Sequence, residues 1–209
     1  MAKKISDKLT FSFGWLALKL MGKSLYSNAW SAISELVANG FDANADTIWV
    51  MVDISNKAKS VIEIFDNGDG MSYDDMQTYT QVGFNKREAY KQRHKTKTAP
   101  PTIMGRKGIG KLAALYLSSH YYILNKPLDG ADSVWEMKFQ EIPDNPNEAP
   151  ALQLCSRTPS LCCKKFWDGI QHGTMLKLVD VDLSGAGEKA LQALSAKLAN
   201  YFSLGTMNA

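Results

Sequence analysis

The sequence predicts an α+β fold: a two-layer sandwich in which one mostly antiparallel sheet carries helices on one face. Strand-like segments follow a helical segment along the chain, and the turns between them are short enough for hairpins. The chain has 209 residues, of which 45% are apolar and 22% are charged. This composition is sufficient to bury a substantial core. We therefore expect one domain over residues 1–209.

The bulk composition argues against several classes of protein. No apolar run approaches the roughly 20 residues that a membrane helix needs, and the N-terminus lacks the apolar core of a signal peptide. A cytoplasmic protein without membrane contact is therefore expected. The three cysteines include an adjacent pair, Cys162 and Cys163, without the spacer of a zinc knuckle, so we interpret them as reduced thiols. The formal net charge of +3 is too small to indicate a nucleic-acid partner by itself.

The first clear element is an amphipathic helix over residues 28–43, which follows a short apolar N-terminal stretch. Trp30, Ile33 and Val37 recur at spacings of three and four, which is the helical period. Asn28 precedes this run and is a candidate N-cap.

Two apolar runs come next and are typical of paired strands. They are TIWVMVDI from Thr47 and SVIEIFD from Ser60. The second run ends in DNGDG, where Gly68 and Gly70 permit backbone angles that are closed to other residues.

A short helix is expected after Ser72, because Asp75 stands at the capping-box position. The stretch from Val82 to Lys111 has no strong period, contains Pro100 and Pro101, and is rich in Lys and Arg. It is predicted to be a long basic loop.

The rest of the chain predicts two more helices and three more strands. One helix begins near Gly110, and an amphipathic helix covers about 185–201. The strand-like segments are residues 120–125, 133–140 and 173–179.

The helix over residues 28–43 also carries a polar stripe. At about 100° per residue, Glu35, Asn39 and Asp42 fall within roughly 60° of one another, opposite Ile33 and Val37. A solvated face usually carries long, flexible side chains, whereas small and apolar residues flank this stripe. The stripe therefore indicates a partly buried polar wall, although spacing alone leaves an ordinary surface stripe open.

Asp66 is the second candidate site residue, because it ends an apolar strand beside glycine-rich backbone. A carboxylate accepts hydrogen bonds only, so it suits the exocyclic amine of adenine and opposes the carbonyl of guanine. Taken alone, DNGDG is also typical of a turn or a calcium-loop fragment. The EF-hand pattern fails, however, because no Glu stands at its twelfth position.

The third candidate is the string GRKGIGK, from Gly105 to Lys111. Three glycines before a helix start are suited to place backbone amides around phosphate oxygens. The spacing also matches a P-loop, but Leu112 stands where a magnesium-binding Ser or Thr is needed, and no apolar strand precedes Gly105. A P-loop nucleotide kinase is therefore the weaker interpretation.

With these strings in order, the chain resembles the GHKL family, which includes DNA gyrase B, the large heat-shock chaperone, histidine-kinase catalytic domains, MutL and the microrchidia ATPases. ELVANGFDANAD resembles the N-box of that family, DNGDGM its adenine-binding motif, GRKGIGKLA its glycine-rich motif and HGTML its fourth motif. The resemblance covers most of the chain and implies the Bergerat fold. The first and third strings are nearer to the microrchidia-like and chaperone-like members than to gyrase.

The resemblance implies a pocket for ATP or ADP with Mg²⁺. Glu35 would be the general base that activates water, Asn39 would bind the Mg²⁺ that bridges the phosphates, and Asp66 would hold adenine. The remaining nucleotide-binding residues that it implies are Asp42, Gly68, Gly70, Met71, Lys86, Gly105, Lys107, Gly108, Ile109, Gly110, Lys111 and Thr174.

The basic stretch over about 82–107 corresponds to the ATP lid of the family. Closure of such a lid excludes water from the phosphates and orders a dimer surface. A solvated loop that never touches ligand is the open alternative. Clustered basic residues also attract nucleic-acid phosphates, but no aromatic stacking pattern supports that contact.

The resemblance predicts an ATP-driven switch: ATP binding closes the lid and promotes homodimerisation, and slow hydrolysis resets it. Gyrase and MutL supply a lysine to the terminal phosphate from a following domain, whereas this chain ends at Ala209. We therefore expect the N-terminal part of a longer protein, with the output in downstream domains.

Two other functions stay open at this point. One is a module that holds ATP or ADP without turnover. The other is a histidine-kinase catalytic domain, although none of His94, His120 and His172 lies in a recognisable phosphoacceptor helix pair.

Overall fold

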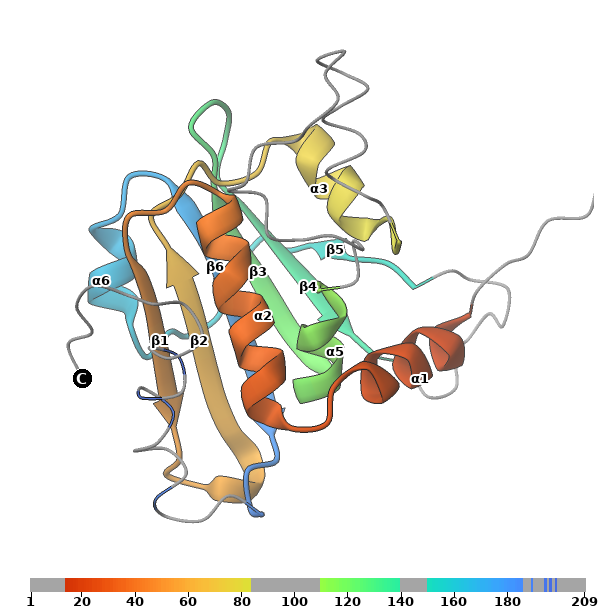
Figure 1. The fold of residues 1–209 in the computed structure, drawn as a ribbon. Coiled ribbons are helices and arrows are strands. Elements are labelled where there is room, and N and C mark those ends of the chain that lie inside the picture. The colour runs from red at the N-terminus through yellow and green to blue at the C-terminus, as the bar shows by residue number, and fades with distance from the viewer. Residues whose placement is uncertain are drawn as a thin grey trace, which may run out of the picture.

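The computed structural model describes residues 14–83, 110–139 and 150–185, together with residues 189, 194, 196 and 198. Within these residues, six strands form one sheet in the order β1-β2-β6-β3-β4-β5, and every neighbouring pair is antiparallel (Figure 1). The predicted α+β class with a mostly antiparallel sheet is confirmed.

The elements have the following bounds. The strands are β1 (Ile48–Asp53), β2 (Ser60–Asp66), β3 (His120–Lys126), β4 (Ser133–Lys138), β5 (Gln153–Leu154) and β6 (Gly173–Val181). The helices are α1 (Trp15–Leu25), α2 (Ala29–Asp42), η1 (Lys57–Lys59), α3 (Tyr73–Thr80), α5 (Leu112–Leu117) and α6 (Lys164–Asp168).

Local signals in the sequence account for the helix starts. The side chain of Asn28 accepts a hydrogen bond from the amide of Ser31 at 2.9 Å, so the predicted cap of α2 is confirmed. Ser72 and Asp75 form the predicted capping box of α3. These side chains satisfy amides that the first helical turn leaves without intrahelical partners.

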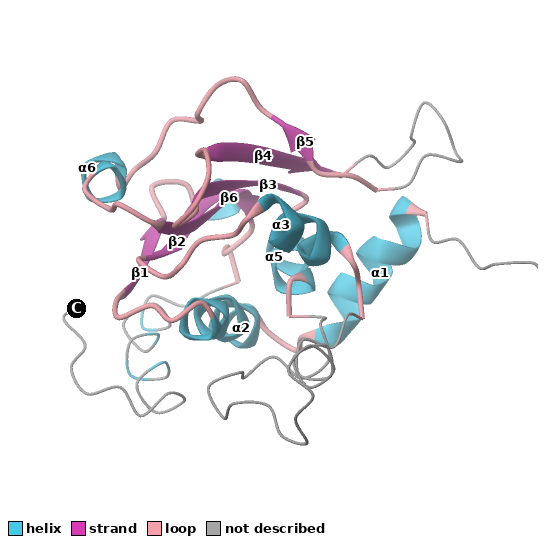
Figure 2. Cartoon of the chain, turned by 90° about the horizontal axis from the view of Figure 1, so that it is seen from above, coloured by secondary structure: helices cyan, strands magenta, loops and turns pink. Residues whose placement is uncertain are grey.

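Helices cover the two faces of the sheet unequally. Figure 2 shows α1, α2, α3 and α5 on one side and the short helix α6 on the other. The prediction of helices on one face therefore holds for the larger layer, whereas α1, α6 and the two-residue strand β5 were not anticipated. The segments that form α1 and α6 are shorter than α2, so neither shows the long helical period that identified α2.

Alternation along the strands divides the core between these faces. Ile62 and Ile64 belong to the core beneath α2 and α5, whereas Phe65 packs with Trp167 in a smaller core beneath α6. Trp49 on β1 stacks on Phe65, with ring centroids 5.0 Å apart. Because successive side chains of a strand point to opposite faces, β2 contributes to both cores.

A buried ion pair lies on the α6 face of the sheet. Glu63 is fully buried, and its carboxylate accepts a bond from the Lys177 ammonium at 3.0 Å. It also accepts the backbone amides of Cys162 and Cys163 at 2.9 and 2.8 Å. One carboxylate therefore ties β2 to β6 and to the segment that leads into α6.

Some predicted elements fall on residues that the structure does not describe. Residues 84–109 contain most of the predicted lid, and they include five predicted site residues that lie outside the described ranges: Lys86, Gly105, Lys107, Gly108 and Ile109. In the predicted C-terminal helix, residues 189, 194, 196 and 198 are helical, and Leu194 and Leu198 are buried in the larger core. Among the described helices, none is long and apolar enough to span a membrane.

Replacing Lys177 by methionine should lower the free energy of unfolding by about 3 kcal/mol, because Glu63 would keep a buried charge opposed only by backbone amides. Urea unfolding followed by tryptophan fluorescence measures this change. Lys164→Met is the matched control, since Lys164 forms an exposed pair with Asp168 at 2.6 Å and should cost less than about 1 kcal/mol. Equal costs for the two variants would contradict a special contribution of the buried pair.

Candidate functional site

A row of polar side chains crosses the three central strands at one end of the sheet. Asp66 ends β2, Thr174 lies in β6 and Asn125 lies in β3, and the register pairs Asn125 with Thr174. The residues that precede or follow them in these strands belong to the core on the α6 side, and they are Phe65, Met175 and Leu124. Because side chains alternate between faces, the polar row lies on the face covered by α2 and α5.

Asp66 is the acidic residue of this row, and 8% of its surface is exposed. Its Oδ1 atom accepts the amides of Gly68 at 2.9 Å and Thr174 at 3.3 Å. Burial raises the pKa of Asp66, whereas these two hydrogen bonds oppose the rise. The second oxygen, Oδ2, receives no hydrogen bond from the described part of the chain.

The loop that follows Asp66 is packed too closely to accept side chains at two of its glycines. A Cβ atom on Gly68 would lie 2.4 Å from the carbonyl oxygen of Ala43, at the end of α2. Gly70 has a φ of +67°, and its Cβ would lie 2.3 Å from the carbonyl oxygen of Lys126. The loop is therefore held between α2 and the end of β3, with its backbone close to the polar row.

The polar stripe of α2 forms the second part of the site. Asn39 and Asp42 are half-buried, and Glu35 is exposed. Gly110, just before α5, adjoins this stripe, since a Cβ atom there would lie 3.0 Å from Oε2 of Glu35 and 3.9 Å from Oδ1 of Asn39. Although Glu35 is exposed as a residue, partial desolvation of its carboxyl group raises its pKa, and the charge of Asp42 raises the pKa further.

Gly40 of α2 connects the two parts. A Cβ atom on Gly40 would lie 3.3 Å from Cβ of Asp66 and 2.7 Å from the side chain of Ile48, so α2 touches the sheet next to Asp66. Asn39 precedes Gly40, and Glu35 lies one helical turn before Asn39. The described site therefore extends along α2 from the buried carboxylate of Asp66 to Glu35 and Gly110.

Lys111 connects the helices on either side of the predicted lid. Its ammonium donates hydrogen bonds to the carbonyl oxygens of Thr78 at 3.2 Å and Gln81 at 2.8 Å, at the end of α3. It also lies 5.5 Å from the ring centroid of Tyr79. The phosphate contact expected of Lys111 stays a prediction.

Two residues of the site were not identified from the sequence. Asn125 is 3% exposed and hydrogen bonds both backbone groups of Met71. Nδ1 of His172 lies 2.6 Å from the carbonyl oxygen of Gly68. One signal in the sequence marks Asn125, an amide near the end of a strand-like segment with an apolar centre, whereas nothing marks His172 beyond its place in the HGTML string.

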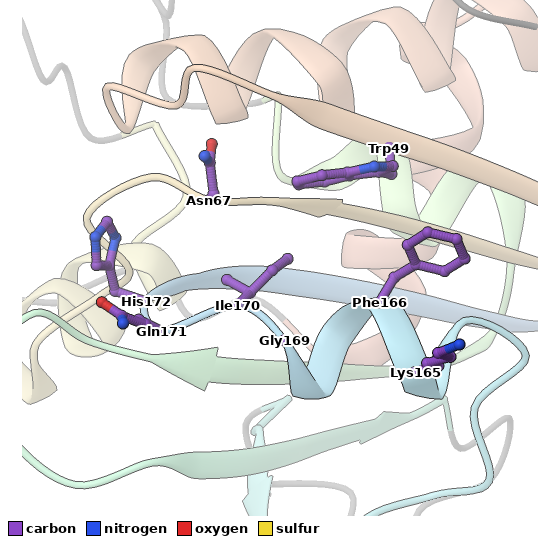
Figure 3. Close-up of a pocket in the computed structure, with 8 residues that line it drawn as sticks. All are labelled: Trp49, Asn67, Lys165, Phe166, Gly169, Ile170, Gln171 and His172. Atoms are coloured by element: carbon purple, nitrogen blue, oxygen red, sulfur yellow. The ribbon is translucent and has the colours of Figure 1, made fainter.

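A groove of about 460 Å³ lies behind this loop on the α6 side of the sheet (Figure 3). Trp49, Phe166 and Ile170 supply its apolar lining, and Asn67 and His172 line the end nearest the loop. Asn67 also accepts the amides of Asp46 and Thr47. The groove is thus separate from the polar row, although the two share the loop as a wall.

The described residues suit a magnesium ion only if the ligand supplies most of its coordination. No group of three or more His, Cys, Asp or Glu side chains in the described ranges could hold a metal ion. Asn39 offers a single amide oxygen beside Glu35. Mg²⁺ commonly keeps several waters and takes further oxygens from substrate phosphates, which fits this arrangement.

Comparison with known proteins agrees with this geometry. Residues 26–158 match the model of the family described as "Histidine kinase-, DNA gyrase B-, and HSP90-like ATPase". The chain is 37% identical over 107 residues to the "Putative type II restriction enzyme HgiDII" of Herpetosiphon aurantiacus. The aligned segment covers 49% of this chain and 15% of that protein. The chain is also 47% identical over 58 residues to the DNA mismatch repair protein MutL of Fervidobacterium nodosum. That alignment covers 28% of this chain and 10% of MutL.

Both relatives are therefore matched over a small share of their length. The family model matches more than half of this chain, from Tyr26 before α2 to Thr158 after β5. The matched region contains Glu35, Asn39 and Asp66. The chain belongs to the family of histidine kinase-, DNA gyrase B- and HSP90-like ATPases.

Proposed function

We propose that residues 1–209 form one domain that binds ATP with Mg²⁺, hydrolyses it slowly and acts as a nucleotide-driven switch. The buried carboxylate of Asp66 carries this proposal. One of its oxygens is occupied by backbone amides, and the other is available to a ligand that offers an N–H group. The amine of adenine meets that requirement, whereas the carbonyl of guanine at the same position repels the carboxylate.

The α2 stripe supports the assignment of the phosphate end. Asn39 would bind the Mg²⁺ ion, Glu35 would orient the attacking water, and Asp42 would support the pocket. The amide of Gly110 and those of the preceding glycine-rich string would contact phosphate oxygens, as helix N-termini and glycine-rich loops do elsewhere. Catalysis of this type depends mainly on positioning and charge stabilisation.

The partners of the domain would be a second copy of the chain and downstream regions of a longer protein. The matched relatives, named as a restriction enzyme and a mismatch repair protein, are both much longer than the segments they share with this chain. Lys111 would transmit the effect of nucleotide binding between helices, because it joins the end of α3 to the start of α5. A ligand at Gly110 would act next to this connection.

Asp66→Asn should weaken the binding of ATP and ADP by about tenfold to a hundredfold. Asparagine can keep accepting the amides of Gly68 and Thr174, but its NH₂ group would then face the adenine amine. Calorimetry with Mg²⁺ measures the affinities, with GTP as the ligand control and Asp74→Asn, an exposed residue of α3, as the protein control. Unchanged ATP affinity in Asp66→Asn would remove adenine recognition from this carboxylate.

Glu35→Gln should retain ATP binding and lose hydrolysis by about 100-fold or more, because the amide cannot accept a proton from water. Phosphate release at saturating ATP measures turnover, and calorimetry measures binding. A wild-type domain that binds ATP without turnover would instead be a passive nucleotide-binding module. Transfer of labelled phosphate to a histidine of an added acceptor protein would identify a kinase domain.

The pH dependence of hydrolysis should report the raised pKa of Glu35. A general base acts only when ionised, so activity should fall as the pH drops through that raised value. Asp42→Asn removes a negative charge that raises the pKa of Glu35, so it should move the acidic limb of the profile to lower pH. The rates are measured at saturating ATP, and a limb that stays in place would show that another group controls it.

A further inference from the structure

Asn125 forms an unusual link between β3 and the loop after β2. Its Oδ1 atom accepts the amide of Met71 at 2.7 Å, and its Nδ2 atom donates to the carbonyl oxygen of Met71 at 2.6 Å. One side-chain amide therefore bonds both backbone groups of one residue, as a neighbouring strand would. The two residues are 54 positions apart in the chain, so this link depends on the tertiary fold.

The same part of β3 holds the residues just before Met71. Gly70 packs against the backbone of Lys126, which follows Asn125. The amide of Leu128 donates to the carbonyl oxygen of Asp69 at 3.0 Å. The end of β3 and the residues just after it therefore contact three successive loop residues, and Asn125 supplies the side-chain hydrogen bonds among these contacts.

The opposite end of the loop is held by α2. The amide of Asp69 donates to the carbonyl oxygen of Ala43 at 2.8 Å, and Gly68 packs against the same carbonyl. Asp66 itself binds the amide of Gly68. The loop thus has one anchor at α2 beside Asp66 and a second anchor at Asn125.

We propose that Asn125 is a positioning residue for base recognition, which fixes Gly70 and Met71 as the wall against which the adenine ring lies. This inference rests on the proposed ATP-binding function. Both polar atoms of the Asn125 side chain are bonded to Met71, and the residue is buried, so Asn125 acts through Met71 and not by contact with the nucleotide. The wall and the Asp66 carboxylate together define where the purine and its amine lie.

Two substitutions test this role. Asn125→Leu has a similar shape and removes both hydrogen bonds. Asn125→Asp keeps an acceptor for the Met71 amide but places an oxygen against the Met71 carbonyl. In both variants, ADP should bind about tenfold more weakly, and the preference for ATP over inosine triphosphate should fall, because the purine is no longer held against Asp66.

Ser118→Ala is the matched control, because Ser118 is a buried residue just before the other end of β3. Its hydroxyl accepts the amide of His120 at 2.9 Å, and its single proton has two acceptors within reach, the carbonyl oxygens of Val179 at 2.5 Å and His120 at 2.7 Å. This substitution should lower stability without changing nucleotide affinity or selectivity. Hydrogen exchange of the Met71 amide adds a measurement without ligand: its protection should fall in Asn125→Leu and persist in Ser118→Ala.

The outcomes separate this inference from the function on which it rests. If the folded wild type binds no adenine nucleotide, the proposed function fails, and the role of Asn125 fails with it. If the wild type binds ADP and the Asn125 variants bind it as tightly and as selectively, only the role of Asn125 is overturned. An equal loss in Ser118→Ala would also overturn it, because general destabilisation would then explain the result.

Discussion

The register of the three central strands determines where the polar groups of the candidate site stand. Asp66 at the end of β2, Thr174 near the start of β6 and Asn125 near the end of β3 lie in one row on the face that α2 covers. The amide of Thr174 donates to Asp66, and Asn125 holds Met71. A shift of one residue in any of these strands would send its polar side chain to the opposite face. The site therefore depends on long-range pairing before it depends on any single side chain.

β2 carries two buried carboxylates, Glu63 and Asp66, and different groups surround each of them. Glu63 faces α6, where the Lys177 ammonium and two backbone amides surround it. Asp66 faces α2, where two amides share one oxygen. A buried charge is costly unless it is paired and hydrogen bonded. Glu63 meets that requirement within the fold and is structural. Asp66 has one oxygen without a hydrogen bond from the described residues, and under the proposed function a nucleotide would supply the missing partner.

Helix α2 gives the site its length. Gly40 brings the helix against β2 beside Asp66, and Glu35 lies five residues earlier, about 7.5 Å along the helix axis at the usual rise. A ligand that reaches both ends, as the proposed function requires, must therefore be elongated. An adenine nucleotide has this form, with an amine at one end and phosphates at the other.

The sequence by itself determined the local features of this protein. Residue types at short spacing predict the cap at Asn28, the capping box at Ser72, the polar stripe of α2 and the position of Asp66 at the end of a strand. The strings that carry the family resemblance are also local, and they stand in the order expected of the family. Only the tertiary structure decided that Asn125 holds Met71, that Lys177 neutralises Glu63 from 114 positions away, and that α6 covers the second face. Periodicity and capping act within a few residues, whereas these partnerships arise from strand order and register, which no local pattern specifies.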